Sequence, residues 1–306
     1  MAYALHRRTA FRQGVSATGW NFDLSKSEYL NSATLLNAAT TSGASGTAIS
    51  PDYLFLTLDS SSLLVLSGGT TRRYDFPANH YGDIFYLQNA KYSYSKDTNM
   101  SPSSIGILPF AFSPDGLHFV RQGLPSGSIA YEFYSCALDS AFDISSIKAT
   151  AGMNMLAEYT GRAVRLAYSA DGLYFLILGS NTMRSYYLSS PFDVSSASLV
   201  YTQVSLTRFT NNCGISAVVA NPSRFCDWQF SPDGFTLVSL WSQRASYDTG
   251  IFFVFKLSAP FNISTMSLDS TWDLGTNYVR GFTIDRLGQN LYVARDTTVQ
   301  HYALSA

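Results

Sequence analysis

The residue types that most often carry catalysis or bind metals are few and scattered in this sequence. The four histidines stand at positions 6, 80, 118 and 301, and the three cysteines at 136, 213 and 226. None has the close spacing to another that metal ligands usually show. The chain contains no GxSxG, HExxH or P-loop motif. We therefore expect no catalytic residue, no metal and no cofactor, and we expect the cysteines to be reduced, small buried residues.

Aspartates are placed more regularly. Asp52, Asp115, Asp171 and Asp233 follow one another at gaps of 63, 56 and 62 residues. A catalytic residue is needed once, so this repetition favours a role in turns, where Asp bonds its own backbone and Gly supplies a positive φ. The turn positions predicted in this way are Asp115, Gly116, Asp171, Gly172, Asp233, Gly234, Asp143 and Asp193.

Acidic residues outside the recurrent turns are the remaining candidates for catalysis. Asp59, Asp97 and Asp248 are the ones expected on loops. They form no evident pair of carboxylates of the kind that hydrolyses glycosides. We therefore predict that the protein is not an enzyme.

Aromatic residues are a second kind of candidate, because their rings stack on sugars and suit recognition surfaces. We predict a ligand-binding role for aromatic residues in or beside irregular loops. These are Tyr92, Tyr94, Phe209, Trp241 and Tyr247.

Two phrases recur along the chain and reveal how such residues are positioned. "FAFSPDGLHFV" begins at 110, "LAYSADGLYFLIL" at 166 and "WQFSPDGFTLVSL" at 228, with degenerate copies at 48 and 282. Each reads as two strands joined by a tight polar turn. "PFDVSSASLV" begins at 191, and similar phrases occur at 22, 142 and 261. The two phrases alternate, so the repeating unit has four strands.

Four-stranded units repeated in this way are typical of β-propellers. Five copies of the SPDG-like phrase predict an all-β, five-bladed β-propeller spanning residues 20–306. The last unit ends without its fourth strand, whereas the chain starts with "WNFDLSKSEYLNSATL", a turn followed by one strand. We therefore expect the N-terminal strand to complete the last blade and to cover its open edge.

Strand order places both recurrent turns on one face of such a propeller. The connections of uneven length fall on the opposite face and include residues 60–73, 90–106 and 207–224. Variable loops on a rigid scaffold carry binding residues more often than uniform turns do. The loop side is therefore the predicted binding face, and residues 1–19 form an N-terminal arm that emerges on the turn side.

Composition limits the classes of partner. The net charge is -1 and charged residues make up 13% of the chain, so nothing favours nucleic acid. No apolar stretch is long enough for a membrane helix, and the N-terminus lacks the apolar segment of a signal peptide. We expect synthesis in the cytoplasm, no membrane insertion, and either a monomer or a homo-oligomer.

The pairing of "FSPDG" with "YYLSSPFDVSSASLVY" resembles a repeat found in virion proteins of tailed bacteriophages, and the resemblance covers roughly residues 20–305. It implies a tail- or fibre-associated structural protein in the virion, with other virion proteins as partners. Host-surface glycan would then be the ligand of the loop face. The arm, through Arg7, Arg8, Phe11 and Arg12, would attach the protein to the particle. The resemblance supplies no catalytic residue.

Three alternatives stay open at the level of sequence. The first is a purely structural decoration or head-fibre protein without a ligand. The second is a glycan-cleaving enzyme on the same fold, which a pair of carboxylates on the loop face would favour. The third is a cellular propeller that scaffolds other proteins.

Overall fold

The computed structural model describes part of the chain. The described residues are 34–40, 53–56, 62–67, 70–76, 91–97, 110–123, 132–143, 163–169, 171–179, 182–204, 224–242, 249–276, 279–285, 287–295 and 298–304. They form β-strands joined by turns, with single-turn 3-10 helices η3 (Val194–Ser196) and η5 (Ile263–Thr265). The predicted all-β class is confirmed.

The described strands form five antiparallel sheets, which we number in chain order. Sheet 1 contains β2 (Tyr53–Leu56), β3 (Ser62–Ser67), β4 (Thr70–Asp75) and β5 (Lys91–Asp97). Sheet 2 contains β6 (Phe110–Phe112), β7 (His118–Gly123) and β8 (Glu132–Ala137). Sheet 3 contains β9 (Ala163–Tyr168), β10 (Tyr174–Gly179), β11 (Thr182–Leu188) and β12 (Ala197–Val204). Sheet 4 contains β13 (Arg224–Phe230), β14 (Thr236–Ser242), β15 (Thr249–Leu257) and β16 (Met266–Thr276). Sheet 5 contains β17 (Val279–Ile284), β18 (Asn290–Arg295), β19 (Thr298–Ala303) and β1 (Thr34–Thr40).

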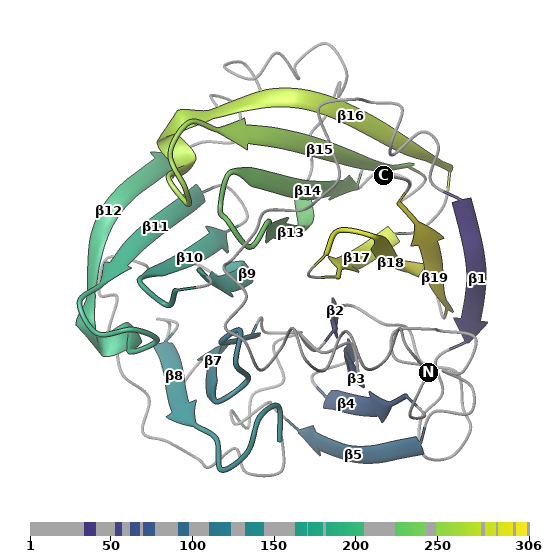
Figure 1. Ribbon diagram of the computed structural model, residues 1–306, viewed down its shortest axis with the longest axis horizontal. Coiled ribbons are helices and arrows are strands. Elements are labelled where there is room, and N and C mark those ends of the chain that lie inside the picture. The colour runs from purple at the N-terminus through teal and green to yellow at the C-terminus, as the bar shows by residue number, and fades with distance from the viewer. Residues whose placement is uncertain are drawn as a thin grey trace, which may run out of the picture.

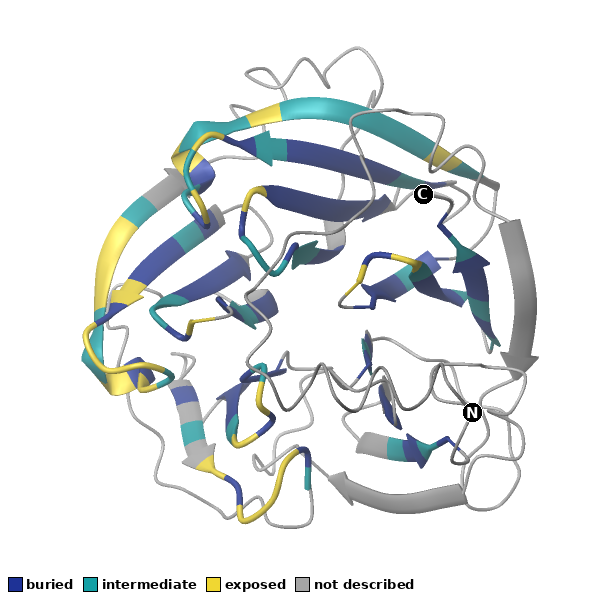
Figure 2. Ribbon diagram, viewed as in Figure 1, coloured by how far each residue is buried: buried dark blue, intermediate teal, exposed yellow. Residues whose placement is uncertain are grey.

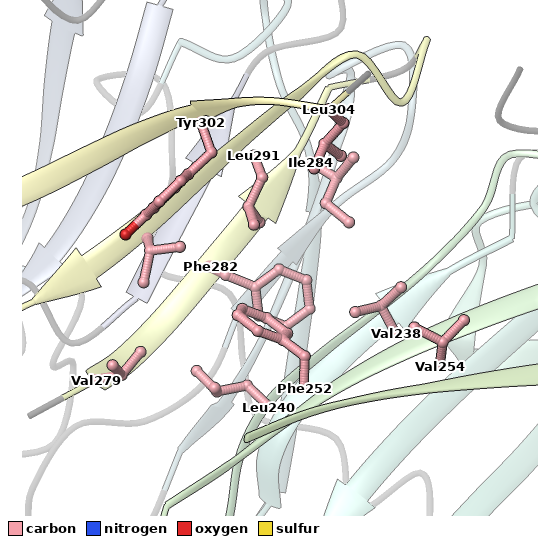
Figure 3. Packing of buried hydrophobic residues seen from close by; sticks show 11 residues of the cluster. Val238, Leu240, Phe252, Val254, Val279, Phe282, Ile284, Leu291, Tyr302 and Leu304 are labelled. Carbon is pink, nitrogen blue, oxygen red and sulfur yellow. The ribbon is translucent and has the colours of Figure 1, made fainter. Parts of the chain in front are cut away.

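Each sheet packs its apolar faces against two neighbours. Figure 1 shows the sheets around a common centre, with β2, β9, β13 and β17 innermost. Figure 3 shows one interface, where Phe252 of sheet 4 meets Phe282 of sheet 5 edge to face with ring centroids 5.0 Å apart. Similar clusters join sheets 1 and 2, 2 and 3, and 3 and 4. A further cluster joins the first sheet to the last through Leu54 and Tyr292. The interfaces therefore form a closed cycle, and burial of these apolar faces is the main force that holds the sheets together.

The N-terminal strand lies at the outer edge of the last sheet. β1 pairs antiparallel with β19, and Thr34 lies opposite Ala303. The two ends of the described chain are thus held in one sheet. The strand begins near the end of the segment that the sequence predicted for it, rather than directly after the phrase at 22.

This pairing can be tested by cross-linking. Ala38 lies directly opposite Gln300, whereas Thr298 is two residues out of register. Facing pairs have Cα atoms about 4.5–5.5 Å apart, within the range of a disulfide, and diagonal pairs are about 7–8 Å apart. We expect Ala38→Cys with Gln300→Cys to form an intramolecular disulfide that increases gel mobility. The matched pair Ala38→Cys with Thr298→Cys should form far less, and equal yields would contradict the register.

The first copy of the SPDG-like turn was assigned wrongly from the sequence. Asp52 precedes β2 and so does not lie between β2 and β3. Leu56 pairs with Leu63 just as Phe112 pairs with Phe119. Asp59 therefore comes three residues after the end of β2, as Asp115 comes three residues after the end of β6. β2 is thus the first strand of its unit, whereas the sequence predicted it to be the second.

Two predicted loops contain strands. Residues 60–73 include β3 and most of β4, and residues 90–106 include β5, the outermost strand of sheet 1. Tyr- and Leu-rich stretches such as these fit pleated, half-buried surfaces. The part of the segment 90–106 that follows Asp97 lies outside the described residues.

Candidate functional site

The hairpins between the two inner strands of sheets 2, 3 and 4 share one hydrogen-bond pattern. In sheet 3, Leu173 donates its N–H to Asp171 Oδ1 at 3.0 Å, and Tyr174 donates its N–H to Ser169 Oγ at 2.8 Å. Sheets 2 and 4 repeat this around Asp115 and Asp233. The following glycines, 116, 172 and 234, have φ between 73° and 75°. Each carboxylate therefore holds its own turn together.

The second recurrent phrase forms a turn that rests on the first. Phe142, Phe192 and Phe261 have φ between 56° and 62°, a left-handed conformation that costs a non-glycine residue free energy. Phe261 donates its N–H to the carbonyl O of Gly234 at 3.0 Å, and a Cβ on Gly234 would lie 2.5 Å from the Phe261 ring. Glycine at position 234 therefore has two roles: it adopts the positive φ that the turn requires, and it leaves room for the Phe261 ring.

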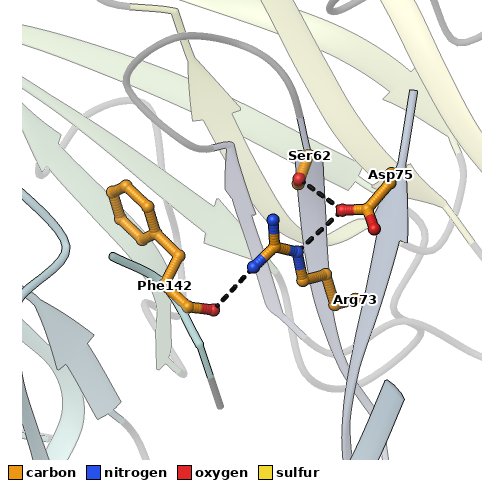
Figure 4. A network of polar contacts seen from close by, with 4 residues as sticks. All are labelled: Ser62, Arg73, Asp75 and Phe142. Carbon is orange, nitrogen blue, oxygen red and sulfur yellow. Dashed lines mark hydrogen bonds and ion pairs between the residues drawn. The ribbon is translucent and has the colours of Figure 1, made fainter. Parts of the chain in front are cut away.

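The same phenylalanines also contact the preceding sheet. The Phe192 ring stacks on His118 of sheet 2, with centroids 5.2 Å apart, and Phe261 stacks on Tyr174 of sheet 3 at 6.0 Å. The Phe142 ring lies 5.8 Å from that of Phe55 in sheet 1. In addition, Arg73 of β4 donates Nη1 to the Phe142 carbonyl O at 3.1 Å and Nε to Asp75 (Figure 4). Each phenylalanine thus links two turns of its own sheet to a neighbouring sheet.

Both kinds of turn lie at the same end of the sheets. Asp227 Oδ2 accepts the N–H of Phe282, and two residues on Gln229 Oε1 accepts the N–H of Ile284. β13 and β17 therefore run in the same direction, so their turns lie at one end. We call this end the turn face. Its described residues are 113–118, 138–143, 171–174, 188–197, 231–236, 257–266 and 287–290.

Asp193 and Asn262 allow a direct test of the turn chemistry. Asp193 Oδ1 accepts the Ser195 N–H at 2.9 Å, and Asn262 Oδ1 accepts the Ser264 N–H at 3.1 Å in the equivalent turn. We expect Asp193→Asn to change the free energy of unfolding little. Asp193→Ala, which lacks the acceptor, should cost about 1 kcal/mol in urea unfolding. An equal loss in both variants would show that the charge, rather than the acceptor, matters.

One polar cluster on the inner strands is not repeated. Arg165 Nη1 lies 2.9 Å from Asp227 Oδ1, and both side chains are almost fully buried. The same carboxylate accepts the N–H groups of Trp228 at 2.8 Å and Phe282 at 2.9 Å. Burial raises the pKa of Asp227 to about 6, and Arg165 and the two N–H donors limit the rise. The carboxylate therefore joins β9, β13 and β17, which belong to three different sheets.

Sequence reasoning missed this cluster. Arg165 and Asp227 each lie four residues before the serine of their turn, Ser169 and Ser231. At the equivalent position, sheet 2 has Pro109 and sheet 5 has Gly281. Charged residues within strands that otherwise face an apolar interior were the available signal. Their pairing joins strands 62 residues apart, and no local pattern indicates it.

Three of the five predicted ligand-binding aromatics lie in the part of the chain that the structure describes. Tyr92 and Tyr94 lie in β5, opposite Tyr74 and Arg73, rather than in a loop. Trp241 is 3% exposed and packs edge to face on Phe253, so its ring belongs to the core and cannot stack on a ligand at the surface. This corrects the prediction for Trp241. Phe209 and Tyr247 lie outside the described residues, as do Arg7, Arg8, Phe11 and Arg12.

The described part of the chain shows neither a metal cluster nor a membrane helix. No group of three or more His, Cys, Asp or Glu side chains there is arranged to hold a metal ion. No helix there is long and apolar enough to cross a membrane.

Comparisons with known proteins identify no family. No family model matches the chain, and no curated protein matches it. Among solved structures, a chain of "Crystal Structure of Mitotic Checkpoint Complex" is 11% identical, with a TM-score of 0.41. "The crystal structure of a functionally unknown protein from Desulfotomaculum acetoxidans DSM 771" is 15% identical, also with a TM-score of 0.41. The alignments cover 80% and 84% of this chain, which spans 61% and 65% of those chains, respectively.

Proposed function

We propose that the chain is a five-bladed β-propeller in which each sheet is one blade and β1 completes the last. The supporting observation is the cycle of apolar interfaces, in which Leu54 and Leu63 of sheet 1 pack with Tyr292 and Val299 of sheet 5. An open row of sheets would leave these two faces exposed to water. The β1–β19 cross-link described above is the direct test of ring closure.

We further propose that this propeller is a non-enzymatic component of a tailed-bacteriophage particle, associated with a tail or fibre. The observation that carries this proposal is the paired phrase itself. The parts that resemble the phage repeat, SADG at 169–172 and PFDVSS at 191–196, form two interlocked turns that meet at Gly172 and Phe192. The resemblance therefore involves a linked structural unit, rather than a short turn motif of the kind that arises by chance.

The two ends of the sheets have different roles in this proposal. The turn face, together with the N-terminal arm, attaches the protein to other virion components. The opposite end contains the connections between described strands at 98–109, 205–223 and 243–248, and contacts glycan on the host surface. Loops of this kind, held by a rigid scaffold, suit recognition.

Immunogold labelling of purified particles tests the virion role. An antibody against residues 98–109 should label tail ends or projecting fibres of particles produced with this gene. Label spread over the head would support head decoration and overturn host contact. Absence of the protein from particles, with its recovery from cell extracts, would overturn the virion role altogether.

Glycan binding has its own test with a matched control. Tyr247 belongs to the connection at 243–248, whereas Tyr187 is 39% exposed on β11, away from the loops. If the loop face binds host polysaccharide, Tyr247→Ala should weaken binding about tenfold, which is the loss expected when one stacked ring is removed. Tyr187→Ala should leave binding unchanged. Equal effects of the two variants would overturn the assignment of the binding face.

A further inference from the structure

Three of the six large apolar side chains exposed in the described part of the chain lie on the turn face. Leu117, Phe235 and Leu287 are 40%, 42% and 38% exposed, and they lie in the inner hairpins of sheets 2, 4 and 5. Figure 2 shows exposed residues in these hairpins around the centre of the molecule. Large apolar side chains exposed together at one end of a protein mark an interaction surface.

Acidic side chains predominate on the turn face. Asp115, Asp171 and Asp193 are exposed there, and the described residues of the face include no Lys or Arg. Two cations reach the face from neighbouring strands, since Arg73 donates to the Phe142 carbonyl O and Lys256 donates to Thr236 Oγ1. The hydrogen bonds of these carboxylates within their turns go to Oδ1. Each can therefore accept a further donor through Oδ2 without giving up its turn.

The N-terminal segment enters the molecule at this face. Thr34, the first residue of β1, lies opposite Ala303, and the next residue, Leu304, donates its N–H to the carbonyl O of Gln289 in the turn. Thirty-three residues precede β1. Because an extended residue spans about 3.3 Å, a segment of this length can reach every part of the face.

The segment also complements the face in charge and polarity. Residues 1–20 contain Arg7, Arg8 and Arg12 and no acidic residue, and Leu5 and Phe11 lie beside the arginines. Arginine is the residue best suited to bind a carboxylate through two hydrogen bonds. The apolar side chains of Leu5 and Phe11 can cover exposed Leu and Phe side chains at the same time.

We propose that residues 1–20 dock on the turn face of their own chain. The arginines pair with the exposed aspartates of the turns, and Leu5 and Phe11 cover Leu117, Phe235 and Leu287. The docked segment and the turns then form one continuous surface. This inference holds wherever the protein is located, and its test is independent of the virion role.

Photo-cross-linking of the full chain tests the proposal. With p-benzoylphenylalanine in place of Phe11, we expect intramolecular cross-links to residues 113–118, 231–236 or 287–290. Cross-links to other parts of the chain would overturn the proposal. Cross-links formed only between two copies, with a yield that rises with protein concentration, would also overturn docking within one chain.

A charge variant provides the matched control. The triple substitution Asp115→Asn, Asp171→Asn and Asp193→Asn keeps the Oδ1 acceptors, as Asn262 does in its own turn. We expect its cross-link yield to fall about tenfold and trypsin cleavage after Arg12 to quicken about tenfold, the combined effect of several exposed ion pairs. Far-UV circular dichroism and thermal unfolding should match the parent. Yields and cleavage rates that are unchanged in a folded variant would overturn the role of the aspartates.

Discussion

Replacing Arg165 by methionine is expected to destabilise the protein by about 3 kcal/mol at pH 8, and by clearly less at pH 5. The guanidinium lies 2.9 Å from Asp227 Oδ1 in a site from which water is almost excluded. Methionine retains much of the apolar volume but leaves the carboxylate without its counter-charge. Breaking a buried pair in this way is costly because one charge stays buried without compensation.

The direction of the pH dependence follows from the pKa of Asp227. That pKa is raised from 3.8 to about 6 by burial, and Arg165 opposes the rise. A carboxyl group whose pKa is higher in the folded than in the unfolded state contributes stability at low pH, and that stability is lost as the pH rises from the unfolded to the folded pKa. In the parent protein this loss is complete a little above pH 6. Without Arg165 the folded pKa is higher still, so the variant continues to lose stability between pH 6 and pH 8.

Urea unfolding of the parent and of Arg165→Met at pH 5, 6, 7 and 8 measures this effect. The control is the double variant Arg165→Met with Asp227→Asn, which has no ionisable group at position 227. Its difference from the parent should show no additional loss between pH 6 and pH 8. A difference between the single variant and the parent that is the same at pH 5 and pH 8 would contradict the ion-pair interpretation.

Gly234→Ala is expected to cost about 3 kcal/mol, of which roughly 1 kcal/mol comes from the positive φ and the rest from displacing a buried ring. The new Cβ would lie 2.5 Å from the Phe261 ring. That ring cannot move easily, because it is 6% exposed and packs against Tyr174 and Phe230. The backbone N–H of Phe261 also donates to the Gly234 carbonyl O, which holds the residue in place.

A double-mutant cycle separates the two contributions. In a Phe261→Ala background the ring is absent, so Gly234→Ala should cost only the roughly 1 kcal/mol due to φ. The free energies of unfolding of the parent, the two single variants and the double variant provide the coupling. If Gly234→Ala costs the same in both backgrounds, the ring is not the obstacle, and the glycine is required for its backbone conformation alone.

Turn residues explain how much of the fold could be predicted. The hairpins at Asp115, Asp171 and Asp233 stand where the sequence predicts them because their chemistry is local, within about six residues. The first hairpin was misplaced because SPD at 50–52 imitates the motif, whereas the pairing of β2 with β3 places the connection at 57–61, where the sequence has serine after Asp59 instead of glycine. The candidate site was predicted less well, since exposure of Trp241 depends on strands packed against it and not on its neighbours in sequence.

By itself, the sequence determined the all-β class, the positions of the inner hairpins in sheets 2, 3 and 4, and the four strands of the unit around Asp171. These depend on alternation of apolar residues and on Asp-Gly turns, and both act over a few residues. Only the tertiary structure decided the pairing of Arg165 with Asp227, the burial of Trp241, the left-handed Phe261 above Gly234 and the register of β1 on β19. Each of these joins segments that are distant in the chain, and its free energy arises from burial and contact that appear only when the sheets pack together.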